Sequence, residues 1–146
     1  MLSEDFEWKK NTKTGIASPW SERHAMYAAG LGTFGLCDGL ITPVGKAMRC
    51  GSVITNLSLK PSERNCESHT DYCLFLDKGK CGKCIKRCPG KAITEEGHSK
   101  KKCLQYQREN IDPSRWEIDV AGCGLCQTDV PCESSVPVTG KFQNWP

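Results

Sequence analysis

The stretch CGKCIKRCP, residues 81–89, decides how the rest of this sequence is interpreted. It places cysteines at positions 81, 84 and 88 and a proline directly after the last of them. This is the spacing that ends a bacterial iron–sulfur run, C-x2-C-x2-C-x3-C-P. Because a four-iron cluster takes four thiolates, the stretch predicts a [4Fe-4S] site that draws its remaining ligands from elsewhere in the chain.

The missing first cysteine of the run has two candidates. The run would place it at position 78, which is Lys78, whereas Cys73 lies a little earlier and Cys66 earlier still. We expect an inserted loop to bring Cys73 into the ligand position, with Cys66 as the alternative. The chain then offers Cys103, the pair in GCGLC at 122–126, and Cys132.

The spacing also predicts how the sulfurs are shared between two clusters. Two residues between cysteines let a tight turn present both sulfurs to one cluster, whereas three residues and a proline direct the next sulfur to a second cluster. One cluster is therefore expected to bind Cys73, Cys81, Cys84 and Cys132. The other is expected to bind Cys88, Cys103, Cys123 and Cys126.

Zinc is the alternative to iron and sulfur. Two C-x2-C pairs, Cys81/Cys84 and Cys123/Cys126, are also typical of zinc sites, and such a chain would be a zinc-stabilised binding module without redox activity. Zinc leaves Cys88 and Cys132 without a role and gives no reason for Pro89. Three further cysteines, Cys37, Cys50 and Cys66, are expected to be incidental or buried thiols.

Composition favours a chain stabilised by inorganic cross-links. Hydrophobic residues make up 38% of its 146 residues, and the mean hydropathy is -0.49. No apolar run approaches the roughly 18 residues of a membrane span, and MLSEDFEWKK does not resemble a signal peptide. We therefore expect a cytoplasmic protein without a membrane segment, in a compartment where disulfides are rare.

The predicted fold class is α+β, in two parts. Residues 1–60 contain a helix expected from Ser18 and Pro19 to Gly30, a glycine-rich loop over 30–48 and a strand over 50–59. Residues 61–146 form the two-cluster part, with helices expected over 82–87 and 100–110. The segment GLGTFG matches the dinucleotide pattern, but it follows a helix where that motif requires a strand.

Lysines and arginine surround the cysteine motifs, at Lys78, Lys80, Lys83, Lys86, Arg87, Lys91 and 100–102. The ordinary interpretation is solvated helix faces. The alternative is a docking surface for an acidic electron donor of the flavodoxin or ferredoxin type. No aromatic residues alternate with these charges, which disfavours nucleic acid as a partner.

Three segments together resemble one enzyme family. They are Ala29-Gly30-Leu31-Gly32 at the end of a helix, the turn Leu40-Ile41-Thr42-Pro43-Val44-Gly45, and Thr55-Asn56-Leu57-Ser58-Leu59. With the cysteine order that follows, they resemble the epoxyqueuosine reductase and reductive dehalogenase superfamily. The resemblance covers roughly residues 18–135.

The resemblance implies a bacterial-type two-[4Fe-4S] ferredoxin-like domain over 61–146. It also implies that residues 1–60 are a helix–loop–strand remnant of a nitroreductase-like domain that holds a corrinoid. The residues expected to approach the corrinoid or the nearer cluster are Gly30, Gly32, Gly35, Thr42, Pro43 and Gly45. Any enzymatic activity would be of the corrinoid-dependent reductase type and would need the missing domain or a corrinoid-binding partner.

Two departures limit what the resemblance implies. Ile16 stands where the epoxyqueuosine enzymes carry a catalytic aspartate, so activity on tRNA is not expected. The second cysteine motif is C-x2-C-x5-C, with Pro131 before Cys132, where the family has three residues before its last cysteine. A turn over 128–131 is expected to absorb the two extra residues.

Overall fold

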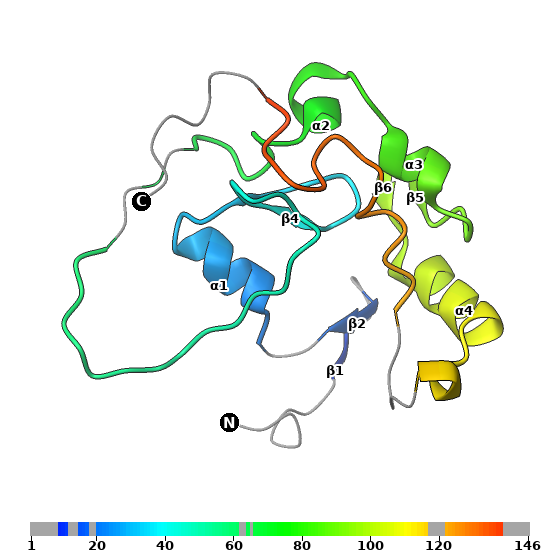
Figure 1. Ribbon diagram of the computed structural model, residues 1–146, viewed down its shortest axis with the longest axis horizontal. Coiled ribbons are helices and arrows are strands. Elements are labelled where there is room, and N and C mark those ends of the chain that lie inside the picture. The colour runs from blue at the N-terminus through cyan, green and yellow to red at the C-terminus, as the bar shows by residue number, and fades with distance from the viewer. Residues whose placement is uncertain are drawn as a thin grey trace.

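A computed structural model describes residues 9–11, 15–17, 20–61, 64, 66–116 and 122–138. In these residues short helices alternate with two-stranded antiparallel hairpins, and loops make up much of the chain (Figure 1). The α+β class expected from the sequence is therefore confirmed.

The first helix begins later than the sequence predicts. After the hairpin of β1 (Lys9–Asn11) and β2 (Gly15–Ala17), α1 spans Glu22–Ala28. The carbonyl of Ser21 accepts hydrogen bonds from the first helical amides, so Ser21 is the N-cap; the expected cap, Ser18-Pro19, lies outside the described residues. Gly30 follows the helix with φ 78°, the left-handed conformation expected of a glycine after a helix end.

The glycine-rich loop contains an unpredicted hairpin. β3 (Thr33–Phe34) pairs antiparallel with β4 (Leu40–Ile41), with Thr33 opposite Ile41. A side chain at Gly32 would meet the Ile41 carbonyl at 2.5 Å. Glycine is therefore required here for the close approach of the chain to itself, which folds the loop into a compact unit.

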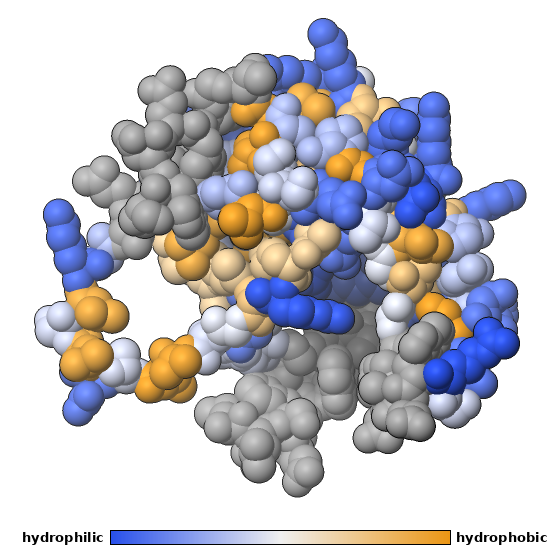
Figure 2. Space-filling model, viewed as in Figure 1, coloured by the Kyte–Doolittle hydropathy of each residue, from blue (hydrophilic) through white to orange (hydrophobic). Residues whose placement is uncertain are grey.

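The strand predicted over 50–59 is wrong. Residues 50–61 form no regular structure and bow away from the body of the molecule (Figure 1). Val53 and Ile54 are 90% and 85% exposed, and apolar side chains stand out along this segment in Figure 2. β-Branched residues match strand propensity, but in the described residues no neighbouring strand pairs with them.

Four short elements and one longer helix build the second half. They are α2 (Leu74–Lys78), α3 (Lys83–Arg87), β5 (Ile93–Thr94), β6 (Gly97–His98) and α4 (Lys100–Asn110), followed by the 3-10 helix η2 (Pro113–Trp116). β5 and β6 form an antiparallel hairpin. Ser99 caps α4 by accepting a hydrogen bond from the Lys102 amide. The helices predicted over 82–87 and 100–110 are confirmed.

The core is small and rich in sulfur. Its buried members are Leu36, Cys37, Ile41, Tyr72, Cys73, Cys84 and Ile93, and partly buried cysteines pack against them. Hydrogen bonds join the two halves: the Tyr72 amide donates to Thr33 Oγ1 at 2.9 Å, and the Phe34 amide donates to the His69 carbonyl at 2.7 Å. The β3–β4 hairpin is therefore packed directly against the cysteine-bearing half.

Candidate metal centres

One group of four cysteines lines a small cavity of about 20 Å³, which we call the first pocket. Its cysteines are Cys73, Cys81, Cys84 and Cys132. Cys73 and Cys84 are buried, at 8% and 9% exposure, whereas Cys81 is exposed. These are the four cysteines that the sequence assigns to one cluster.

The sequence predicts an inserted loop between Cys73 and Cys81, whereas the structure has the short helix α2 there. Cys73 is the N-cap residue of α2, and Gly79 ends the helix with φ 64°. Gly82, also left-handed with φ 74°, then starts α3. Because both glycines favour this conformation, the chain turns back after one short helix and brings residues 73, 81 and 84 to one cavity.

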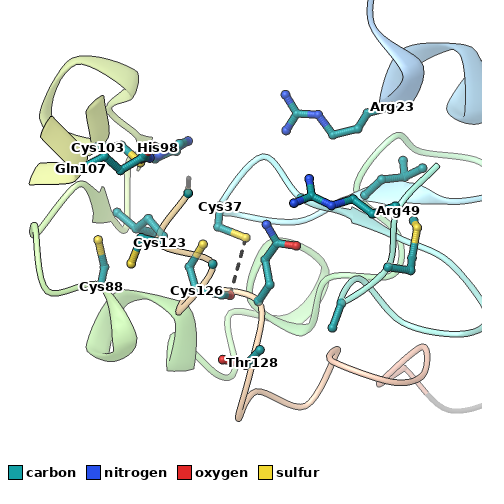
Figure 3. A pocket seen from close by; sticks show the side chains of 18 of the residues that line it. Arg23, Cys37, Arg49, Cys88, His98, Cys103, Gln107, Cys123, Cys126 and Thr128 are labelled. Carbon is teal, nitrogen blue, oxygen red and sulfur yellow. Dashed lines mark hydrogen bonds between the residues drawn. The ribbon is translucent and has the colours of Figure 1, made fainter. Parts of the chain in front are cut away.

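A second group of four cysteines lines a larger cavity of about 790 Å³, the second pocket (Figure 3). Cys88 ends α3, Cys103 lies on α4, and Cys123 and Cys126 come from the loop at 122–126. Cys37 and Cys50 line the same pocket. The second predicted ligand set is therefore brought together as well, and the assignment of all eight ligands stays a prediction.

Two sulfurs of the second pocket accept hydrogen bonds from the protein. The Ala92 amide donates to Cys88 Sγ at 3.2 Å, and Gln107 Nε2 donates to Cys103 Sγ at 3.1 Å. Such bonds favour a charged sulfur. Burial nevertheless raises the pKa of the Cys103 thiol, and the Gln107 bond only partly opposes it.

The alternative first ligand, Cys66, lies elsewhere. It is half-buried against the core, and it lines neither cysteine pocket. Across the described ranges, no three His, Cys, Asp or Glu side chains are gathered tightly enough to hold a single metal ion.

The loop of the second motif is held by Arg87. Its guanidinium donates to the Leu125 carbonyl at 3.3 Å, to the Thr128 carbonyl at 3.1 Å and to Thr128 Oγ1 at 3.2 Å, and it pairs with Asp129 at 3.4 Å. Asp129 adopts φ 53°, so the chain turns sharply in the region where a turn over 128–131 is expected. Cys132 follows this turn and reaches the first pocket.

The residues expected to approach a corrinoid lie mostly against the protein itself. Gly35 lines the first pocket, whereas the other five, Gly30, Gly32, Thr42, Pro43 and Gly45, line neither cysteine pocket. Gly45 has φ 81°, and a Cβ there would overlap the Glu133 carbonyl. Its role in corrinoid binding stays a prediction.

Sequence reasoning missed a buried pair, Cys37 and Lys46. They are 5% and 3% exposed, and Lys46 Nζ donates to Cys37 Sγ at 3.1 Å. From its spacing, Cys37 is expected to be no more than a buried or incidental thiol. The local signal is a lysine directly after the glycine-rich turn, and nothing in its position along the chain pairs it with Cys37.

The opposite charges of Cys37 and Lys46 stabilise each other. Burial disfavours the Lys46 ammonium, but the negative charge of Cys37 and then of Cys132 raises its pKa above the usual value. Hydrogen bonds from the Cys126 and Cys84 thiols lower the pKa of Cys37, against the effect of burial. The pKa values of Cys84 and Cys126 rise in turn, first because they donate to Cys37 and then because they are buried.

Burial is the main cause that raises the pKa of Cys132, although the charge of Lys46 opposes it. Several thiols around the two pockets are thus expected to hold their protons in the metal-free chain. Thiolate ligands must be deprotonated, so metal binding here would release protons.

The basic side chains near the motifs are on the surface. Lys78, Lys80, Lys83, Lys86, Lys91 and the lysines at 100–102 are exposed, and Arg87 is half-buried. Among the helices of the described residues, none has the length and apolar character needed to cross a bilayer.

No protein-family model matches the chain, and no solved structure gives a significant match. Curated relatives are found. A tetrachloroethene reductive dehalogenase of Sulfurospirillum multivorans is 34% identical over 113 residues, which are 70% of this chain and 22% of the relative. One from Desulfitobacterium hafniense is 30% identical over 141 residues, or 90% and 23%.

An epoxyqueuosine reductase of Lactococcus garvieae is 28% identical over 116 residues, which are 74% of this chain and 30% of the relative. The chain thus spans between a fifth and a third of the length of these relatives. Reductive dehalogenases and an epoxyqueuosine reductase are therefore distant homologues of this chain, at low identity, and the resemblance inferred from its motifs is confirmed.

Proposed function

We propose that this chain transfers electrons through two [4Fe-4S] clusters held in a ferredoxin-like domain. The observation that carries the proposal is the separation of eight cysteines into two pockets, one lined by Cys73, Cys81, Cys84 and Cys132 and the other by Cys88, Cys103, Cys123 and Cys126. The cysteine spacing alone predicts the same division, in which Cys88 binds a different cluster from Cys81 and Cys84.

The donor set fits such clusters. Each pocket offers at least four cysteine sulfurs, and thiolates are the ligands that iron–sulfur clusters use. When bound, each cluster would supply one-electron redox chemistry. The protein's own contribution is to shield the sulfurs from water, as burial of Cys73 and Cys84 does, and to donate hydrogen bonds to them, as Ala92 and Gln107 do.

We propose a small flavodoxin- or ferredoxin-type protein as the electron donor. The exposed lysines beside both motifs would attract its acidic surface and steer it toward the clusters. The electron that this partner loses is the electron that the chain accepts.

As the acceptor we propose a corrinoid, held by a partner or a further domain against residues 1–60. The relatives are named for reductive reactions on tetrachloroethene and epoxyqueuosine. No residue of the described chain is assigned to cleaving a substrate. The chain is proposed to supply electrons to that step, in the reducing environment of the cytoplasm where its free cysteines stay available.

Anaerobic purification followed by metal and sulfide analysis tests this proposal. About eight irons and eight sulfides per chain, with a coupled S = 1/2 electron paramagnetic resonance signal after dithionite reduction, are expected for two four-iron clusters. Zinc without sulfide would contradict the proposal and would identify the chain as a zinc-stabilised module. Stoichiometric cobalt would place the corrinoid on this chain, whereas iron and sulfide alone would make it a carrier.

A further inference from the structure

A charged pair lies between the two cysteine pockets. Lys46 lines the first pocket and Cys37 lines the second, and Lys46 Nζ is 3.1 Å from Cys37 Sγ. At 3% exposure, this lysine differs from the exposed lysines around the motifs. A buried ammonium beside the proposed ligands is an unusual charge to retain without a function.

The protein backbone holds this lysine in place. Its amide donates to the Cys132 carbonyl at 2.9 Å and to the Glu133 carbonyl at 3.0 Å. Gly39 lies against both members of the pair, since a Cβ there would be 3.3 Å from Cys37 Sγ and 3.4 Å from Lys46 Cδ. The loop that supplies the proposed ligand Cys132 therefore also positions Lys46.

The positive charge lies at the first pocket, since Lys46 lines that pocket and not the second. After Cys37, its largest electrostatic interactions are with Cys132 and Cys84, both in the proposed ligand set of that pocket. It also acts on Cys126 of the second set. Solvent screens a buried charge much less than an exposed one. The potential of an iron–sulfur cluster depends on local charge and on hydrogen bonds to its sulfurs, and a nearby cation favours the state with one more electron.

We propose that Lys46 sets the order of the two reduction potentials. Its buried ammonium raises the potential of the cluster held by Cys73, Cys81, Cys84 and Cys132, so that this cluster retains the electron when one electron is shared between the two. The electron comes from the protein donor, or from dithionite in the experiment below. This inference rests on the proposed function and adds to it which of the two clusters retains the electron.

The test is a potentiometric titration of the purified, iron-loaded protein, followed by electron paramagnetic resonance. Lys46→Gln and Lys46→Met remove the charge, Lys46→Arg retains it, and Lys83→Met removes an exposed lysine that lines the same pocket. In both neutral variants we expect one of the two midpoint potentials to fall, with the reduced-to-oxidised ratio at fixed potential falling about tenfold, or about 59 mV for one electron. Lys46→Arg and Lys83→Met should stay near the wild type.

The outcomes separate this inference from the proposed function. Potentials unchanged in iron-loaded Lys46→Gln and Lys46→Met overturn the inference alone. So does an equal fall in Lys46→Arg, because charge would then not be the cause. If the neutral variants lose iron while Lys46→Arg keeps it, the ammonium is structural and the inference is overturned. A wild-type protein without iron overturns the proposed function first.

Discussion

Arg87 donates two hydrogen bonds to Thr128, one to its carbonyl at 3.1 Å and one to its hydroxyl at 3.2 Å. The two residues are far apart in sequence, and each belongs to a different cysteine motif. The contact joins α3, between Cys84 and Cys88, to the loop that follows Cys126. One side chain thereby connects the two motifs.

Replacing Arg87 by alanine is expected to destabilise the protein. Hydrogen bonds to charged groups contribute about 1.5–3 kcal/mol each in buried settings, and the partly exposed guanidinium lowers that figure, so we expect a loss of about 1–3 kcal/mol in the free energy of unfolding. Urea denaturation under anaerobic conditions measures it. Arg87→Lys should recover little of the loss, because an ammonium cannot form the same planar fork.

The exposed neighbour Lys86 provides the control. Lys86→Ala should change the free energy of unfolding by less than about 0.5 kcal/mol, as is usual for surface positions. An Arg87→Ala variant as stable as Lys86→Ala would show that the contact with Thr128 does not hold the loop.

Gly45→Ala is expected to disrupt the fold near the first pocket. Gly45 has φ 81°, and the added Cβ would overlap the Glu133 carbonyl. Because backbone on both sides must move, we expect a loss above about 3 kcal/mol, among the largest effects of single substitutions. Thermal unfolding and iron content measure it. Gly51→Ala is the matched control, since a Cβ at Gly51 would have no neighbouring atom within 4 Å; equal stability of the two variants would contradict the packing described here.

Cys73→Ser is expected to lose about half of the bound iron, since one of the two proposed four-iron clusters would lose a ligand, and Cys66→Ser is expected to keep all of it. Cys73 lines the first pocket, whereas Cys66 lines neither. Iron and sulfide analysis of the two variants, purified side by side, distinguishes them. The reverse result would make Cys66 the ligand and leave Cys73 as a core residue.

The spacing of the cysteines limits which sulfurs can meet, so the sequence predicts which of them line each pocket, while their assignment as cluster ligands stays a prediction. Helix α4 was predictable for a similar reason, since Ser99 supplies a local cap and the helix needs few distant contacts. The strand over 50–59 failed because a strand depends on a partner, and the β-branched residues there carry no information about whether one exists.

The Cys37–Lys46 pair could not be predicted, because it depends on tertiary packing. The two residues lie on either side of β4 and meet only after the β3–β4 hairpin and Gly39 have folded. Helix α2 was missed because it is very short, although it does not depend on distant contacts. Five residues between Cys73 and Gly79 are too few to show a helical period, and only the left-handed glycine marks its end.

Stability is expected to fall at alkaline pH because of Tyr72. Its side chain is 0% exposed, and burial, followed by the charges of Cys66 and Asp71, raises its pKa from 10.0 to about 12. A group whose pKa is raised on folding stabilises the fold fully below its unfolded pKa, and this contribution is lost as pH rises to the folded value. The loss should therefore fall between pH 10 and 12.

The expected size is roughly 2–3 kcal/mol, since one pKa unit corresponds to about 1.4 kcal/mol. Anaerobic urea denaturation at a series of pH values compares wild type with Tyr72→Phe, which lacks the titrating hydroxyl. The difference between their free energies of unfolding should be constant below pH 10 and should shift in favour of the variant above it. A difference that does not vary up to pH 12 would mean that water reaches the phenol of Tyr72, and that the core around Cys73 is more open than its packing indicates.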